Sequence, residues 1–177
     1  NLVIAARGQG DVGERRTGPA GIALDLRSPD LSKPTRIEGL GPTRIVGVLT
    51  ADGERERFIG RGEMTDLARF GYGLRTVSGP IELGHRKGEF SLKSDLTGAG
   101  GQGRGLLAAV LGAAPQVSLE GARIADQGWL LRDLKARGAG LDVAASGARS
   151  LLGGLTFKGT AKVSNLAAWR PDAAGGL

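Results

Sequence analysis

The segment Leu155-Thr-Phe-Lys-Gly-Thr-Ala-Lys-Val-Ser-Asn-Leu166 alternates small or apolar residues with polar ones over most of its length. Successive side chains of a β-strand point to opposite faces, so a period of two predicts a strand with one apolar face and one solvated face. The same alternation returns in Gly21-Ile-Ala-Leu-Asp-Leu-Arg27 and in Glu89-Phe-Ser-Leu-Lys-Ser-Asp-Leu96. Repeated amphipathic strands are therefore the main structural signal of this chain.

Glycine, proline and Asp-Gly sequences punctuate the chain at regular spacing, which is typical of antiparallel hairpins. They predict turns that include Asp52-Gly53, Ser78-Gly79-Pro80 and Gly153-Gly154. The predicted strands are Leu2–Arg7, Gly21–Arg27, Thr35–Leu40, Pro42–Thr50, Arg55–Glu63, Gly73–Val77, Ile81–Gly84, Gly88–Leu96, Gln116–Ile124, Trp129–Ala136, Leu141–Gly147 and Leu155–Leu166.

One segment, Gly105–Ala113, lacks alternation, is rich in helix formers and ends before Pro115, so it predicts a short apolar helix. Met64–Phe70 is a candidate for a second helical turn. The expected fold class is all-β: an elongated, curved antiparallel sheet, a β-taco-like groove, with one short helix. We expect residues 1–177 to be a single excerpt of an extended β-groove protein, in which the helical insertion at about 105–113 divides strand blocks 1–97 and 116–177.

Composition excludes several classes of site. The 177 residues contain no Cys and one His, so a thiolate metal site and the His-based zinc sites are not expected. The net charge of +6 comes from basic residues that stand singly or in pairs beside acids, with 4% aromatic residues, so we expect no nucleic-acid partner. The lone His85 lies beside Arg86-Lys87-Gly88, which indicates a solvated turn residue rather than a general base. No metal and no cofactor are expected.

One enzyme-like motif is present. Gly98-Ala-Gly-Gly-Gln-Gly103 has the G-x-G-x-x-G spacing by which dinucleotide sites bring their backbone close to a pyrophosphate. The preceding strand carries Lys93 and Asp95, whereas the first strand of such a fold is buried on both faces. A dinucleotide-binding enzyme that uses Gly98–Gly103 remains an alternative, but we expect a protein that is not an enzyme.

The order of elements from about Gly98 onward resembles the translocation and assembly module TamB and its AsmA-like relatives, which are bridge-like lipid-transfer proteins of the Gram-negative envelope. The segments that carry the resemblance are Leu106–Leu111, Pro115–Glu120, Leu130–Lys135, Ala139–Gly147, Leu151–Gly159 and Val163–Ala167, together with Ile22–Asp30 nearer the start of the chain.

The resemblance implies a groove-shaped sheet within a periplasmic protein that is anchored in the inner membrane. Such a protein would pass phospholipids between the inner and outer membranes and support outer-membrane biogenesis, with a barrel partner of the TamA type that is reached through the parent protein.

The alternation itself points to an aliphatic face that guides phospholipid acyl chains, because a large exposed apolar strip marks a binding surface. The predicted lining residues are Ile22, Leu24, Leu26, Leu119, Leu141, Val143, Phe157 and Val163. A different role is a chaperone or scaffold, in which an open sheet edge pairs with strands of outer-membrane proteins by β-augmentation.

Overall fold

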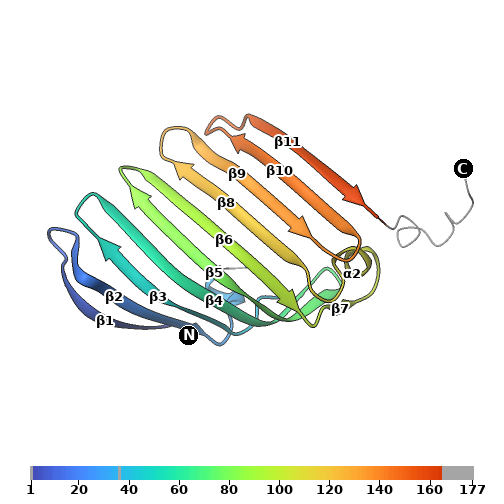
Figure 1. Ribbon diagram of the computed structural model, residues 1–177, viewed down its shortest axis with the longest axis horizontal. Helices are drawn as coiled ribbons and strands as arrows, with labels where there is room; N and C mark the ends of the chain where they lie inside the picture. Colours follow the sequence, from blue (N-terminus) through green and yellow to red (C-terminus); the bar gives the residue numbers. More distant parts are fainter. Residues whose placement is uncertain (1, 36, 165–177) are drawn as a thin grey trace, which may run out of the picture.

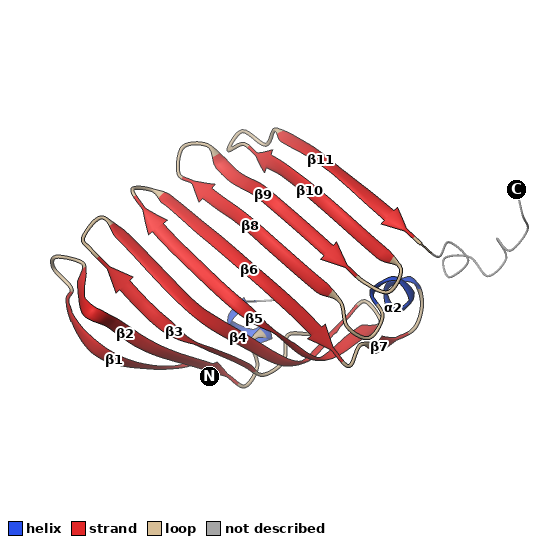
Figure 2. Cartoon of the chain, in the orientation of Figure 1, coloured by secondary structure: helices blue, strands red, loops and turns tan. Residues whose placement is uncertain are grey.

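The computed structural model describes residues 2–35 and 37–164, which form one open antiparallel sheet and two short helices (Figure 1, Figure 2). The described elements are β1 (Val3–Asp11), β2 (Arg16–Ser28), α1 (Ser32–Thr35), β3 (Thr43–Ala51), β4 (Arg55–Arg69), β5 (Tyr72–Arg86), β6 (Glu89–Ala99), β7 (Gln102–Gly103), α2 (Leu106–Leu111), β8 (Gln116–Ile124), β9 (Gly128–Arg137), β10 (Leu141–Arg149) and β11 (Leu155–Val163).

Strand order in the sheet follows the chain, from β1 to β6 and then from β8 to β11, and all of these neighbours are antiparallel. The two-residue β7 lies off this path and pairs with the start of β5. The sheet is curved and does not close on itself, since β1 and β11 stand at opposite ends of the order. The predicted all-β class and curved antiparallel sheet are confirmed.

The connections differ between the two ends of the strands. At the end that we call the hairpin end, short turns such as 12–15, 52–54 and 87–88 join consecutive strands. The opposite end, the inserted end, carries two longer connections, residues 29–42 with α1 and residues 100–115 with β7 and α2 (Figure 1). Backbone hydrogen bonds attach both: Ala68 N donates to Gly39 O, and Gly140 N donates to Val110 O.

Glycines inside the strands let large side chains lie flat on the sheet. Gly47 and Gly60 are cross-strand partners on β3 and β4, and a Cβ atom at either position would lie 2.6 Å from Cζ of Phe58. Gly62 stands in the same relation to Cδ1 of Ile81, also at 2.6 Å. Because the glycines leave room, Phe58 is only 7% exposed although no second layer covers it. Glycine is therefore part of how this sheet packs, and not only of how it turns.

Few side chains are deeply buried in the described residues. The buried apolar residues are Phe58, Tyr72, Leu74, Val110, Ala122 and Ala145, and none of the described side chains is fully buried. Most domains bury apolar faces between two packed layers. Here the contacts between elements are those of adjacent strands, with α2 touching β7. The sheet is thus a single layer over the described residues.

Several boundary predictions were wrong. In the predicted strand Thr35–Leu40, Thr35 is the end of α1 and residues 37–40 form a loop, while residue 36 lies outside the described part of the chain. The candidate helical turn Met64–Phe70 is the last part of β4 up to Arg69, followed by a turn at Phe70. Asp66 has a positive φ of 55°, so the chain there departs from a regular strand without becoming helical. Ala68 and Thr65 in this stretch donate to the 29–42 connection, which supplies the partners that β3 does not reach.

The predicted turn Ser78-Gly79-Pro80 was also wrong, because these residues lie inside the continuous strand β5. Proline has no N–H to donate, and the β5–β6 ladder skips Gly79 and Pro80 before it resumes at Ile81. Ser94 Oγ donates to Pro80 O at 3.1 Å across this gap. Close contact with the opposite strand, rather than a turn, explains the glycine, since a Cβ at Gly79 would collide with the backbone of Asp95.

The helical insertion is confirmed at Leu106–Leu111, close to the predicted 105–113. It separates strand blocks 1–97 and 116–177 in sequence but not in space, because β6 pairs directly with β8 along nine residue pairs. The last three residues of the predicted strand Leu155–Leu166 follow β11, and residues 165 and 166 lie outside the described part of the chain.

Candidate functional site

All eight predicted lining residues lie on one side of the sheet. The pairings put Leu24 in register with Leu119 through Gly47, Gly60, Ile81 and Ser94. Directly paired residues share a face, so the assignment holds across the whole sheet. The pairings continue from Leu119 through Leu134 to Ala145, which places Val143 and Leu141 on the same side, and Leu141 pairs directly with Val163. We call this side the apolar face.

One row of the apolar face crosses nine strands and contains mostly large apolar side chains. Its members, from β2 to β11, are Ile22, Leu49, Phe58, Leu83, Leu92, Gly121, Leu131, Gly147 and Phe157. Strands lie about 4.8 Å apart, so eight steps make a continuous apolar track of about 40 Å at right angles to the strands.

Of the nine members of this track, only Ile22 and Phe157 were among the predicted lining residues. In β3 the apolar residues Ile45 and Leu49 face the track, but Val46 and Val48 are apolar as well and face the other way. A strand that is apolar on both faces has no alternation to follow, so its inward face cannot be chosen from sequence. The pairing with β2 decides which face of β3 is the apolar one, because Ile22 and Leu26 of β2 pair with Leu49 and Ile45.

In β3 and β4, burial differs between the two faces. In β3 the residues of the apolar face are half-buried and those of the other face are exposed, without exception along nine residues. On a curved sheet the side chains on the inner side converge and shield one another. The apolar face is therefore the inside of the curve, and over the described residues no layer of helix or sheet lies across it.

Two clefts open along the apolar face. A wide cleft of about 540 Å³ lies over β1 to β4 near the hairpin end, between Ile22 and Leu49 and the arginines of the β1–β2 turn. A smaller cleft of about 210 Å³ lies over β6, β8 and β9, and its walls are almost entirely apolar, including Leu92, Leu119 and Leu131. The apolar face therefore has room for a ligand, and the room is elongated rather than enclosed.

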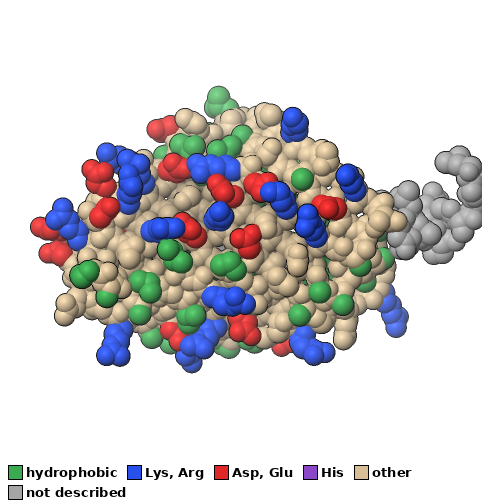
Figure 3. Space-filling model, viewed as in Figure 1, with side chains coloured by type: hydrophobic (Ala, Val, Ile, Leu, Met, Phe, Trp, Pro, Cys, Tyr) green, Lys and Arg blue, Asp and Glu red, His purple; other side chains and the backbone are tan. Residues whose placement is uncertain are grey.

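The opposite side, which we call the charged face, carries paired ions. Asp25 accepts from Arg27 Nη2 at 2.7 Å and from Arg44 Nη2 at 2.8 Å. Farther along, Arg57 Nε donates to Glu82 Oε1 at 2.8 Å, and Arg132 Nη2 donates to Glu89 Oε1 at 2.7 Å. Figure 3 looks onto this face, where positive and negative side chains lie interspersed.

The ion pairs on this face shift the pKa of one carboxylic acid, Asp25. The two guanidinium groups hold the pKa of Asp25 well below its usual range, mainly through their hydrogen bonds. Exposed Val46, Val48 and Ile59 interrupt the charges over β3 and β4. The charged face is thus solvated and internally compensated, with one apolar interruption.

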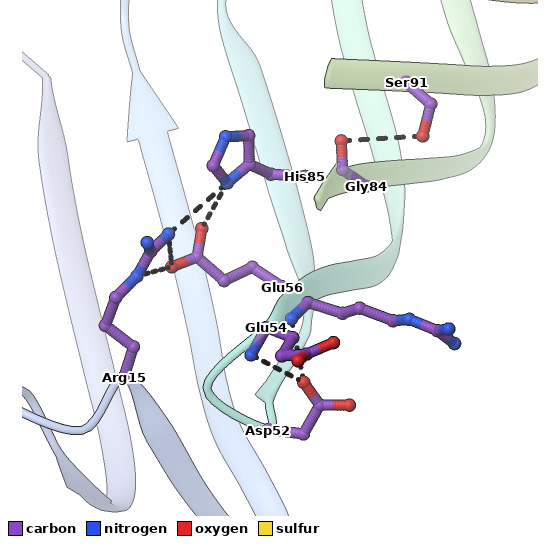
Figure 4. A network of polar contacts seen from close by, with 8 residues as sticks. Arg15, Asp52, Glu54, Glu56, Gly84, His85 and Ser91 are labelled. Atoms are coloured by element: carbon purple, nitrogen blue, oxygen red, sulfur yellow. Dashed lines mark hydrogen bonds and ion pairs between the residues drawn. The ribbon is translucent and has the colours of Figure 1, made fainter. Parts of the chain in front are cut away.

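A polar cluster closes the apolar face at the hairpin end near β4 and β5 (Figure 4). Arg15 donates to Glu56 Oε1 from Nε at 2.9 Å and from Nη2 at 2.6 Å, and His85 Nδ1 lies 3.2 Å from Glu56 Oε2. These bonds, with Arg15 contributing most, lower the pKa of Glu56. His85 therefore lies half-buried within β5, which corrects its prediction as a solvated turn residue.

Nearby, the predicted Asp52-Gly53 turn is confirmed. Asp52 Oδ1 accepts from the backbone N–H of Glu54 at 3.0 Å and of Arg55 at 2.8 Å, as Figure 4 shows. This is an Asx-type turn, in which the side chain substitutes for a backbone acceptor. The turn acids thus have a structural partner each, and no group of acids or His in the described residues is arranged to hold a metal ion.

The glycine motif Gly98–Gly103 has no dinucleotide-binding context. It runs from the end of β6 into β7, and the strands on either side of α2 are antiparallel. A dinucleotide site needs parallel strands joined by a crossover helix, and α2 has six residues. Gly98 instead lies beneath Leu74, whose Cδ atoms would be 2.9 Å from a Cβ at that position.

Comparison with known proteins adds no assignment: the chain matches no protein-family model, no curated protein and no solved structure. Among the described residues, neither helix has the length and apolar character that crossing a membrane requires.

Proposed function

We propose that the apolar face binds the acyl chains of phospholipids, as one segment of a longer periplasmic groove that carries lipids between the inner and outer membranes. The parent protein, anchored in the inner membrane, would support outer-membrane protein assembly through a barrel partner of the TamA type. The chain has no catalytic role in this proposal. The observation that carries it is the apolar track of about 40 Å on the inside of a curved single-layer sheet.

Acyl chains suit this track on energetic grounds. Each methylene that leaves water contributes about 0.8 kcal/mol, so a few contacts hold a chain without polar recognition. The hydrocarbon core of a bilayer is about 30 Å thick and contains two layers of chains. A track of about 40 Å is therefore longer than the chains of one leaflet. Its side chains are already ordered by strand pairing, which lowers the entropic cost of binding.

The direct test changes two predicted lining residues at opposite ends of the apolar face, Leu24 on β2 and Phe157 on β11. Leu24→Arg with Phe157→Arg places two charges among the acyl chains, and we expect the lipid that co-purifies with the protein to fall to background in native mass spectrometry. Val46→Arg with Thr160→Arg is the matched control, because both residues lie on the charged face. Equal lipid content in the two double variants would contradict the proposal.

A second test avoids disrupting the fold. The chain has no native cysteine, so single cysteines can carry an environment-sensitive fluorophore without background. Leu119→Cys and Ser118→Cys are neighbours on opposite faces of β8. Phospholipids with brominated chains should quench the label at position 119 and leave that at position 118 nearly unchanged. Equal quenching at both positions would contradict binding on the apolar face.

The alternative role, β-augmentation of client strands, is favoured by the two edges of the sheet. All nine residues of β1 are exposed, as are eight of the nine in β11. An unpaired edge offers backbone groups to an incoming strand. A Thr160→Pro substitution in β11 removes a backbone N–H, so it should reduce crosslinking to outer-membrane protein segments while lipid binding continues. Loss of lipid binding together with crosslinking would argue against a separate edge function.

A further inference from the structure

At the hairpin end, one row of the apolar face contains charged side chains as well as apolar ones. From β3 to β11 the paired residues of this row are Ala51, Glu56, His85, Phe90, Arg123, Trp129, Arg149 and Leu155. The next row toward the middle of the sheet is the apolar track itself. The row therefore runs beside the track along its length, so the polar end of an amphiphile whose chains lie on the track can turn toward this row.

The two halves of the row differ in charge balance. Over β4 and β5, Arg15 from the neighbouring turn neutralises Glu56, which also contacts His85. Over β8 to β10, Arg123 and Arg149 flank Trp129, each as its direct cross-strand partner. Among the described residues, neither of these two arginines makes an ion pair or a side-chain hydrogen bond. Four arginines of the charged face, by contrast, each have a carboxylate partner: Arg27, Arg44, Arg57 and Arg132.

Trp129 lies between Arg123 and Arg149 and also lines an apolar cleft. The Cζ atom of Arg123 lies 5.8 Å from the centroid of the Trp129 ring, within the range of a cation–π contact. Trp129 is 60% exposed. Together with Arg123, it forms one wall of the 210 Å³ cleft, whose other walls include Phe90 and Leu131. Tryptophan favours positions of this kind, where one part of the ring is apolar and the other meets water.

From this juxtaposition we propose that Arg123 and Arg149 bind the phosphate of a phospholipid headgroup, with Trp129 at the boundary between headgroup and chains. Their strands lie two steps apart, about 10 Å, so two flexible guanidinium groups can converge on one phosphate above Trp129. Guanidinium groups match phosphate oxygens with paired donors. The inference rests on the proposed function, since the acyl chains of the same lipid would lie in the cleft and along the track.

The test uses the intact 177-residue protein and compares two amphiphiles whose hydrocarbon chains have the same length. Short-chain phosphatidylglycerol below its micellar concentration supplies the phosphate, and an alkyl maltoside of matched chain length lacks it. Arg123→Gln with Arg149→Gln removes the proposed site. Arg57→Gln with Arg137→Gln removes two arginines from the charged face and is the control for net charge. Circular dichroism establishes that each variant is folded, and calorimetric titration measures binding.

We expect the Arg123/Arg149 variant to bind phosphatidylglycerol about fivefold more weakly than wild type, as exposed charge-assisted contacts allow. Its affinity for the maltoside should be unchanged, and the Arg57/Arg137 variant should bind both ligands like wild type. Equal weakening in the two variants, or none in either, would overturn the headgroup site while leaving acyl-chain binding in place. Wild-type protein that binds neither amphiphile would overturn the proposed function and this site together. Inorganic phosphate that binds wild type as tightly as the lipid would overturn the assignment to a lipid headgroup.

Discussion

The two faces of this sheet are built from the same strands, yet they meet their physical requirements in opposite ways. The charged face satisfies its side chains internally, by ion pairs such as those of Asp25 with Arg27 and Arg44. The apolar face does not, because no described layer covers it: its side chains shield one another in β3 and β4, but Trp129 and Phe157 remain exposed. Of the two faces, only the apolar face has side chains that a bound ligand could still cover.

The largest difference between the faces should appear in stability. Phe58 and Ile59 are neighbours in β4, but Phe58 is 7% exposed over Gly47 and Gly60 whereas Ile59 is 50% exposed. Phe58→Ala should lower the free energy of unfolding by about 3 kcal/mol, because it uncovers two glycines and leaves a gap. Ile59→Ala should cost under about 1 kcal/mol. Urea denaturation measures both, and similar losses would show that the faces are equally packed.

A smaller difference should separate two serines of β6. Ser94 lies on the apolar face, is buried and donates to Pro80 O at 3.1 Å, where the ladder with β5 is interrupted. Ser91 lies on the charged face, and its Oγ is 3.5 Å from Gly84 O. Ser94→Ala should cost about 1 kcal/mol of unfolding free energy, since the carbonyl of Pro80 loses a partner in a buried setting. If Ser91→Ala lowers the free energy of unfolding as much as Ser94→Ala, the hydrogen bond to Pro80 O has no special role at the interruption of the ladder.

The smallest effects concern titration, and they compare one carboxylate from each face. The pKa of Asp25 on the charged face and that of Glu56 on the apolar face are both lowered by arginine. A lowered pKa in the folded state stabilises the fold at pH values above the unfolded pKa, near 4. That contribution is lost as the pH falls through the folded value.

Removing the arginine partners should therefore raise the two pKa values. We expect Arg44→Gln to raise the pKa of Asp25 only partly, because Arg27 remains bound. Arg15→Gln should raise that of Glu56 further toward its ordinary value, because Arg15 is its main partner. Carboxyl carbon chemical shifts followed by NMR against pH measure both changes. An unchanged pKa of Glu56 in Arg15→Gln would show that the cluster in Figure 4 does not neutralise the apolar face.

The sequence was a reliable guide wherever a strand was apolar on one face only. Gln116–Ile124 was predicted to the residue, and Leu24 and Leu26 were placed on the correct side because Asp25 and Arg27 flank them. It was a poor guide where a residue type such as glycine or proline occurs both in turns and inside strands. Glycine and proline at 79 and 80 were interpreted as a turn, but they lie within β5 at a point of close strand contact.

Period-two patterning by itself determined the all-β class and which eight residues share one face, because alternation acts locally and is visible without a partner strand. The short helix was predicted from the lack of alternation, the helix formers and Pro115. Only the tertiary structure decided that β6 meets β8 across the insertion, that Phe58 lies over two glycines, and that Arg123, Trp129 and Arg149 stand side by side. Those facts depend on the register between strands, which is set by non-local pairing and leaves no signature within any single strand.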